Sequence, residues 1–182
     1  MSIRILGLGN ALMSDDGFGP YVVRVLEALY ELPDRVQVID AGMPGLEATH
    51  HLSGAEAVIL VDTVAAEGAP GDIHAWQLRD ILADAPQARV SPHDPGIKDA
   101  LLAAAAAGAA PGHVLLVGVV PEWVATGAHL SRPVRSAIAP VVGLIVAELE
   151  RLGCAPVPRR VPRHPDTWWE RAADEEPAVA LR

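Results

Sequence analysis

The sequence predicts an α/β protein in which helices cover both faces of a mostly parallel sheet. Four short, largely apolar runs have the length of buried strands: residues 3–8, 36–40, 57–62 and 113–120. Longer segments with helical spacing of apolar residues alternate with them: residues 17–32, 44–52, 97–107 and 132–152. Strands that are apolar on both faces must be covered on both faces, so this alternation indicates a parallel sheet between two layers of helices.

A further strand is expected at residues 72–78, whose sequence is DIHAWQL. Its apolar and polar residues alternate, which is typical of an edge strand with one solvated face. The expected sheet therefore has about five strands. The alanine-rich run at 103–107 only continues a helix.

The chain divides into a body and a C-terminal extension. A length of 182 residues suffices for one domain with a substantial core, which we expect over residues 1–153. From residue 154 onward, prolines and mixed charges predict a loosely packed or disordered extension over 154–182. Trp168 and Trp169 are the exception, and docking on the body and docking on a partner are both open for them.

Charge and cysteine content exclude several classes of protein. The net charge is −9, and because residues 154–182 hold five Arg and five acids, the body carries all of it. An acidic body argues against nucleic acid or anionic membrane as a partner. The single cysteine, Cys154, excludes an internal disulfide and is expected as a free surface thiol among prolines.

The N-terminal sequence enters a strand-like run directly, without a basic segment followed by an apolar one. No stretch reaches the roughly 18 uninterrupted apolar residues of a membrane span. These features predict a cytoplasmic protein. No long apolar face or heptad pattern is evident, so we expect a monomer.

Acidic residues follow the carboxyl ends of the expected strands, where functional groups gather in open α/β sheets. Asp15 and Asp16 come after the glycine turn of the first strand, Asp40 ends the second, and Asp62 ends the third. The turn VSPHDPG, residues 90–96, adds His93 and Asp94 before the next helix.

Each of these residues has an ordinary structural explanation when it is taken alone. Asp15 is suited to cap the following helix, and Asp16 is favoured by the helix dipole. Asp62 could simply close a turn, and His93 could be a loop residue. Together, however, the acids form a cluster of like charge that requires a cation. Two carboxylates and an imidazole suit a first-row divalent metal.

A dinucleotide site is excluded at the same turn. The third glycine of a G-x-G-x-x-G motif is absent, because Leu12 stands in its place. Asp15 and Asp16 would also repel a phosphate. The turn instead presents carboxylates to a cation.

Five segments in this order resemble the hydrogenase maturation endopeptidases, which process the large subunit of [NiFe] hydrogenases: GLGNALMSDDGFG, VDT, SPHDPG, GVVPE and HLSRPV. The resemblance spans roughly residues 2–150. It implies a three-layer α/β/α sandwich with a five-stranded sheet. It also implies removal of a short C-terminal extension from the large-subunit precursor after nickel insertion, with cleavage after a His or Arg near the last nickel-ligating cysteine pair.

The resemblance further implies which residues contact the metal. They are Asp16, Asp62 and His93, and the metal is nickel supplied by the precursor, for which other divalent metals can substitute. Relatives commonly have glutamate at the first position, so Asp16 is one methylene shorter. They also often read Gly-Gly-Thr after the aspartate that matches Asp40, where this chain has AGMPG at 41–45. We assign Asp40 a supporting role in orienting water or the peptide.

The common proteolytic motifs are absent from the sequence. It contains no H-E-x-x-H and no G-x-S-x-G, and its one cysteine lies in the extension. We therefore expect a half-built metal site that the nickel of the precursor completes. Two alternatives share these residues: a non-catalytic nickel-sensing chaperone of the large subunit, and a peptidase of the same fold with another substrate.

Overall fold

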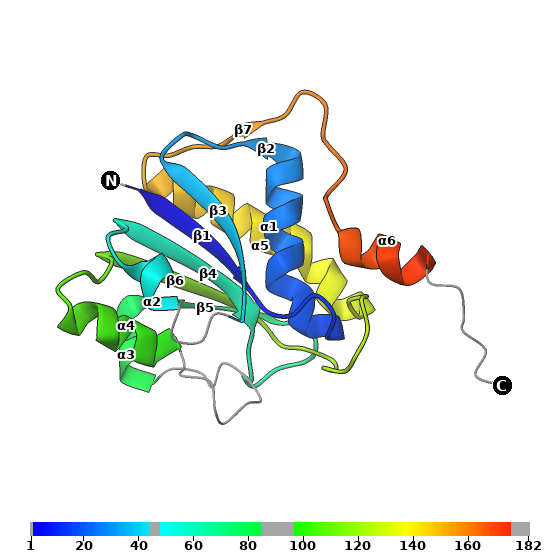
Figure 1. The fold of residues 1–182 in the computed structure, drawn as a ribbon, viewed down its shortest axis with the longest axis horizontal. Helices are drawn as coiled ribbons and strands as arrows, with labels where there is room; N and C mark the ends of the chain where they lie inside the picture. Colours follow the sequence, from blue (N-terminus) through cyan, green and yellow to red (C-terminus); the bar gives the residue numbers. More distant parts are fainter. Residues whose placement is uncertain (1, 44–47, 85–96, 176–182) are drawn as a thin grey trace.

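The computed structural model describes residues 2–43, 48–84 and 97–175 (Figure 1). A five-stranded sheet runs through its centre, in the order β3-β1-β4-β6-β5. Its strands are β1 (Ile3–Leu8), β3 (Val36–Gly42), β4 (Ala57–Thr63), β5 (Ile73–Gln77) and β6 (His113–Val119). Four strands are parallel, and β5 pairs antiparallel with β6 at one edge. The predicted fold class and the predicted edge strand are confirmed.

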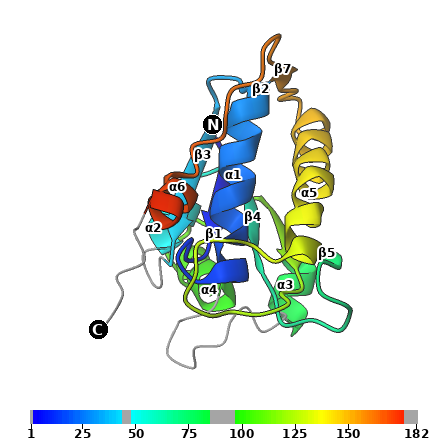
Figure 2. The same cartoon turned by 90° about the vertical axis from the view of Figure 1, so that its right-hand side faces the viewer.

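Helices form a layer on each face of the sheet (Figures 1 and 2). One layer holds α1 (Phe18–Leu29) and α5 (Arg132–Arg151). The other holds α2 (Ala48–Leu52), α3 (Leu78–Asp84) and α4 (Ile97–Ala106). The sequence did not predict α3, and the first expected helix ends earlier than residue 32, because Tyr30–Glu31 form the short strand β2. Residues 44–47 of the second expected helix lie outside the described part of the chain.

The core consists of two apolar clusters on either side of β4. All seven residues of β4 are buried, as a central parallel strand covered on both faces requires. Side chains that point to one face pack against α1 and α5, and those on the other face pack against α2, α3 and α4. Within the described ranges, even the longest helix lacks an apolar stretch that could cross a lipid bilayer.

The start of α1 lies unusually close to the strand ends. A Cβ atom on Gly19 would stand 2.2 Å from the Leu8 carbonyl oxygen and 2.5 Å from that of Val61. A Cβ on Gly7 would stand 2.5 Å from the Gly19 carbonyl oxygen. Glycine at these positions lets the first turn of α1 contact the ends of β1 and β4. The loop between β1 and α1 is thereby held at this edge of the sheet.

The C-terminal extension begins at the end of α5, where the chain turns toward the core. Gly153 follows α5 with φ +72°, and the Cys154 N–H donates to the Leu149 carbonyl at 2.8 Å. This is the Schellman arrangement, in which the residue after the glycine contacts the last helical turn. The expectation of a surface thiol at Cys154 is wrong, because the residue is free but buried in the core.

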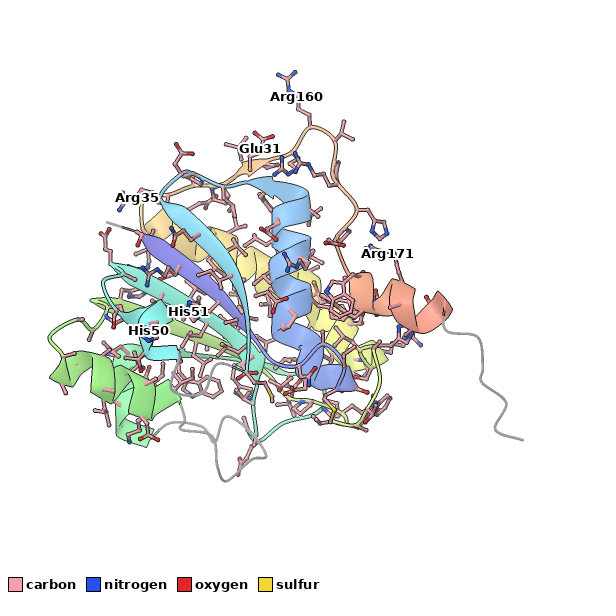
Figure 3. The ribbon with its side chains drawn as sticks, viewed as in Figure 1. Glu31, Arg35, His50, His51, Arg160 and Arg171 are labelled. Carbon is pink, nitrogen blue, oxygen red and sulfur yellow. The ribbon has the colours of Figure 1, made fainter. Side chains whose placement is uncertain are left out.

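Residues 154–167, which we call the strap, run back along α1. The strand β7 (Val157–Pro158) pairs antiparallel with β2. The Arg159 N–H donates to the Leu29 carbonyl at 2.8 Å, and the Arg159 guanidinium contacts Glu31 at 3.1 Å. Figure 3 labels Glu31 at the end of α1, where the strap passes.

The strap ends in α6 (Trp168–Glu175), which lies beside the N-terminal half of α1 (Figure 2). Trp169 is buried and meets the Tyr21 ring edge-on, with ring centroids 5.2 Å apart. Glu170 forms ion pairs with Arg135 and His129. Burial alone would raise the pKa of the Glu170 carboxyl, but contacts with Tyr21, Arg135 and His129 lower it to about 2. Trp169 therefore docks on the body, which answers the open question for this residue.

Candidate functional site

The loop between β1 and α1 is shaped by glycine and by backbone hydrogen bonds. Gly9 has φ +129°, which side chains disfavour, and its N–H donates to the Gly42 carbonyl at 2.8 Å. Ser14 donates its N–H to the Gly127 carbonyl at 2.7 Å, which ties the loop to the segment after β6. A short 3₁₀ helix, Ser14–Gly17, then carries both aspartates.

Asp15 does not cap a helix, contrary to the simplest structural expectation. Its carboxylate is fully buried and accepts backbone N–H groups of Glu122, Trp123 and Ser131 at 2.9, 3.1 and 2.6 Å. These three donors replace the water that the charge loses on burial. The helix α1 begins after Gly17 without a side-chain cap. Asp15 therefore fixes the loop that follows β6.

Asp16 and Asp62 come together through Thr63. Asp16 accepts the Asn10 N–H at 2.8 Å and the Thr63 hydroxyl at 3.4 Å. Asp62 accepts the Thr63 N–H at 2.8 Å. Both aspartates are buried, with 5% and 1% of their surface exposed. Two buried carboxylates, one from β4 and one from the segment after β1, thus lie at the carboxyl edge of the sheet, and each accepts a hydrogen bond from Thr63.

His93 and Asp94 lie outside the described residues, so the position of the expected third ligand stays a prediction. In the ranges 2–43, 48–84 and 97–175, no three His, Cys, Asp or Glu side chains are grouped as a metal site would require. Asp16 and Asp62 are two of the three expected ligands. This pair leaves the remaining metal ligands to another segment or to a bound partner.

Asp40 lies on β3, the strand next to β1 in the sheet. It stands opposite Gly7 in the sheet register, and its carboxylate is 3.4 Å from the Arg24 guanidinium. It also lines a groove of about 340 Å³ that we call the Trp168 groove. The groove is lined by Gly9, Asn10, Ala11, Leu12, Pro20, Asp40, Gly42, Met43, Trp168 and Trp169.

Sequence reasoning did not identify Thr63, and it singled out Trp168 without predicting its position. Thr63 bonds to both aspartates, and its position in the VDT segment was the available signal. Trp168 forms one wall of the groove, but nothing in its local sequence indicates which elements it faces. The backbone of Asn10 joins the two regions, because this residue lines the groove and also donates to Asp16.

Comparison with known proteins gives consistent results for sequence and structure. A family described as hydrogenase maturation protease matches residues 20–148. The hydrogenase expression/formation protein HupM of Azotobacter chroococcum is 36% identical over 159 residues, covering 87% of this chain and 76% of the relative. The hydrogenase 2 maturation protease of Escherichia coli is 32% identical over 160 residues, covering 87% of this chain and 97% of the relative.

Solved structures show the same likeness. The hydrogenase maturating endopeptidase HybD of E. coli superposes with a TM-score of 0.81 at 32% identity, over 87% of this chain and 98% of that one. The match thus extends over most of both chains. The shared fold and the matched residues together place the chain in the hydrogenase maturation protease family, whose members are peptidases that process hydrogenase precursors.

Proposed function

We propose that this protein removes a C-terminal extension from the large-subunit precursor of a [NiFe] hydrogenase after nickel insertion, and that it recognises the inserted nickel through Asp16, Asp62 and His93. The observation that carries the proposal is the contact of Asp16 and of Asp62 with Thr63, which gathers two buried carboxylates at one sheet edge. Buried carboxylates of like charge are costly together, and a cation bound between them relieves that cost.

In this proposal the metal arrives with the substrate. Asp16 and Asp62 bind the nickel that the precursor already holds, and His93 completes the protein's share of the ligands. The bound metal tethers the scissile peptide, and such positioning alone can lower a barrier by several kcal/mol. The nickel also polarises the peptide carbonyl or a bound water, as metals do in other hydrolytic sites.

The same arrangement acts as a check on assembly. A precursor without nickel lacks the link to the two carboxylates and escapes cleavage. Processing then follows metal insertion without a separate signal. Because one cleavage per precursor suffices, a fast nucleophile is unnecessary.

The test is the intact mass of a nickel-loaded and a nickel-free large-subunit precursor after incubation with the protein. We expect a C-terminal peptide to be lost from the nickel-loaded form only. D62N, D16N and H93A should each slow this loss about a hundredfold or more, because each removes a metal ligand. D99N, an exposed position on α4, serves as the matched control and should cleave at the normal rate.

The other outcomes point to other functions. A stable complex without loss of mass would indicate the chaperone. Cleavage of unrelated peptides would indicate a same-fold peptidase with another substrate. Normal processing of nickel-loaded precursor by D62N and H93A would refute recognition of nickel through these residues.

A further inference from the structure

The extension adds a wall to the surface beside the Asp16 loop, and this wall lies outside the part of the chain that matches the family model, residues 20–148. The strap and α6 are firmly attached. Trp169 is 1% exposed, and β7 is hydrogen-bonded to β2. The adjacent residue Trp168 is nevertheless 51% exposed.

Trp168 is held in place rather than free to collapse onto the body. Its neighbours Trp169 and Glu170 are anchored on Tyr21 and Arg135. Arg171, which Figure 3 labels on α6, pairs with Asp166 at 2.8 Å. The rings of Trp168 and Trp169 meet edge-on, with ring centroids 5.9 Å apart. The contacts of its neighbours thus hold the exposed Trp168 side chain in a fixed position.

The Trp168 groove is apolar on its walls. Leu12 and Met43, which also line it, are 48% and 56% exposed. Large exposed apolar side chains around a groove, with an aromatic residue in one wall, are typical of surfaces that bind another chain. Asn10 lines the groove and also donates its N–H to Asp16, so the groove lies next to the candidate site.

The groove also carries charge. Among its described lining residues only Asp40 is ionisable as an acid or base. The neighbouring Arg24 is 3.4 Å from Asp40 and 3.2 Å from Glu27, so one positive charge is shared between two carboxylates. The local excess is negative, as is the body with its net charge of −9. A cationic side chain complements this end of the groove.

We infer that the Trp168 groove binds an extended segment of the hydrogenase precursor, with an apolar side chain packed on Trp168 and a Lys or Arg side chain paired with Asp40. This inference rests on the proposed function, since the precursor is the chain that is brought to Asp16. Trp168 then contributes to substrate affinity, and it comes from the C-terminal extension.

The experiment measures binding and cleavage separately on the full chain with nickel-loaded precursor. W168A should weaken precursor binding about tenfold, the usual loss for an interface tryptophan. Its single-turnover cleavage rate at saturating precursor should stay within about twofold of the wild type, because Trp168 does not touch the reacting bond. W168F should restore most of the affinity.

Two further variants complete the test. D40N should also weaken binding and should reduce its dependence on salt, because the charge pair is lost. V161A is the matched control, since Val161 is a 79% exposed apolar residue of the strap outside the groove, and it should bind normally. Melting temperatures of all variants check that α6 stays docked.

The results separate the two proposals. Unchanged precursor affinity in W168A, with normal cleavage by the wild type, overturns the groove assignment and leaves the proposed function intact. Binding without cleavage by the wild type refutes the proposed function, and the effect of W168A on that binding still decides the groove. A change in sedimentation of W168A without a change in precursor affinity would identify a second copy of the chain as the occupant, and would overturn the inference.

Discussion

Asp15 and Asp16 are adjacent in sequence, but their carboxylates have different hydrogen-bond partners and different roles. Successive residues of a 3₁₀ helix point about 120° apart. Asp15 therefore reaches the loop after β6, where it accepts three backbone N–H groups, and Asp16 reaches Thr63 at the end of β4. One residue organises the surroundings of the site, and its neighbour belongs to the site.

D15N is expected to lower the free energy of unfolding by about 2 kcal/mol. The substitution keeps the shape of the side chain, but it turns one accepting oxygen into an amide that faces N–H donors. Chemical denaturation gives the free energy. The control D34N changes an exposed aspartate in the turn before β3 and should stay within about 0.5 kcal/mol of the wild type.

If D15N were as stable as D34N, the three hydrogen bonds of Asp15 would not hold the loop. The accompanying readout is the fluorescence of Trp123, whose backbone N–H is one of the three donors. Its emission should shift in D15N and stay constant in D34N.

At the start of α1, the helix backbone lies so close to the ends of β1 and β4 that only glycine fits between them. The close approach of Gly7 and Gly19 does the task that the third glycine of a dinucleotide turn would do, which is to let a helix pack against a strand. The motif here differs because its loop carries acids instead of a phosphate-binding turn. A glycine of this kind can be recognised only after the helix has been placed on the sheet.

G19A is expected to destabilise the protein by about 3 kcal/mol or more, because the new methyl group would overlap backbone atoms that cannot move aside. G143A tests the same chemical change on α5, where nothing lies within 4 Å of an added Cβ. It should stabilise the protein by about 0.8 kcal/mol, since alanine favours a helix over glycine. Thermal unfolding of both variants measures the difference.

Equal effects of G19A and G143A would show that α1 does not pack on the ends of β1 and β4 as described. Helix propensity alone favours alanine at both positions. Destabilisation by G19A together with stabilisation by G143A would therefore show that close packing is the cause at Gly19.

The C-terminal extension contributes side chains to the hydrophobic core of the body. Cys154 and Trp169 belong to the same apolar cluster as α1 and α5, and the strap joins them along the outside of α1. The body and the extension therefore share one core in the described part of the chain. The thiol of Cys154 becomes a direct reporter of whether this core is intact.

Cys154 is expected to react with a thiol reagent at least about a hundredfold more slowly in the native protein than in denaturant, because the core must open before the reagent reaches the sulfur. The control is V161C in a C154A background, which places the only thiol at an exposed strap position. It should react rapidly in both conditions. Rapid labelling of native Cys154 would mean that the strap detaches readily.

The alternation of strands and helices could be predicted because it depends on local patterns of apolar residues. The edge strand β5 followed from its alternating residues, and the acids at the ends of β1, β3 and β4 followed from the rule for strand ends. Asp15 was misinterpreted because a helix cap and a long-range acceptor look the same in sequence. Cys154 was misplaced because the proline-rich context outweighed the helix-ending signal of Gly153.

The sequence alone was sufficient to predict the fold class and the sheet edge at which Asp16 and Asp62 lie. Hydrophobic period and turn residues act over a few positions, so they can be read without knowing the fold. Only the tertiary structure decided that Thr63 joins the two aspartates, that Asp15 holds a distant loop, and that α6 returns to form the Trp168 groove. Apart from the hydrogen bond between the neighbours Asp62 and Thr63, these contacts join residues 47 to more than 100 positions apart. They depend on how the packed layers meet rather than on any local pattern.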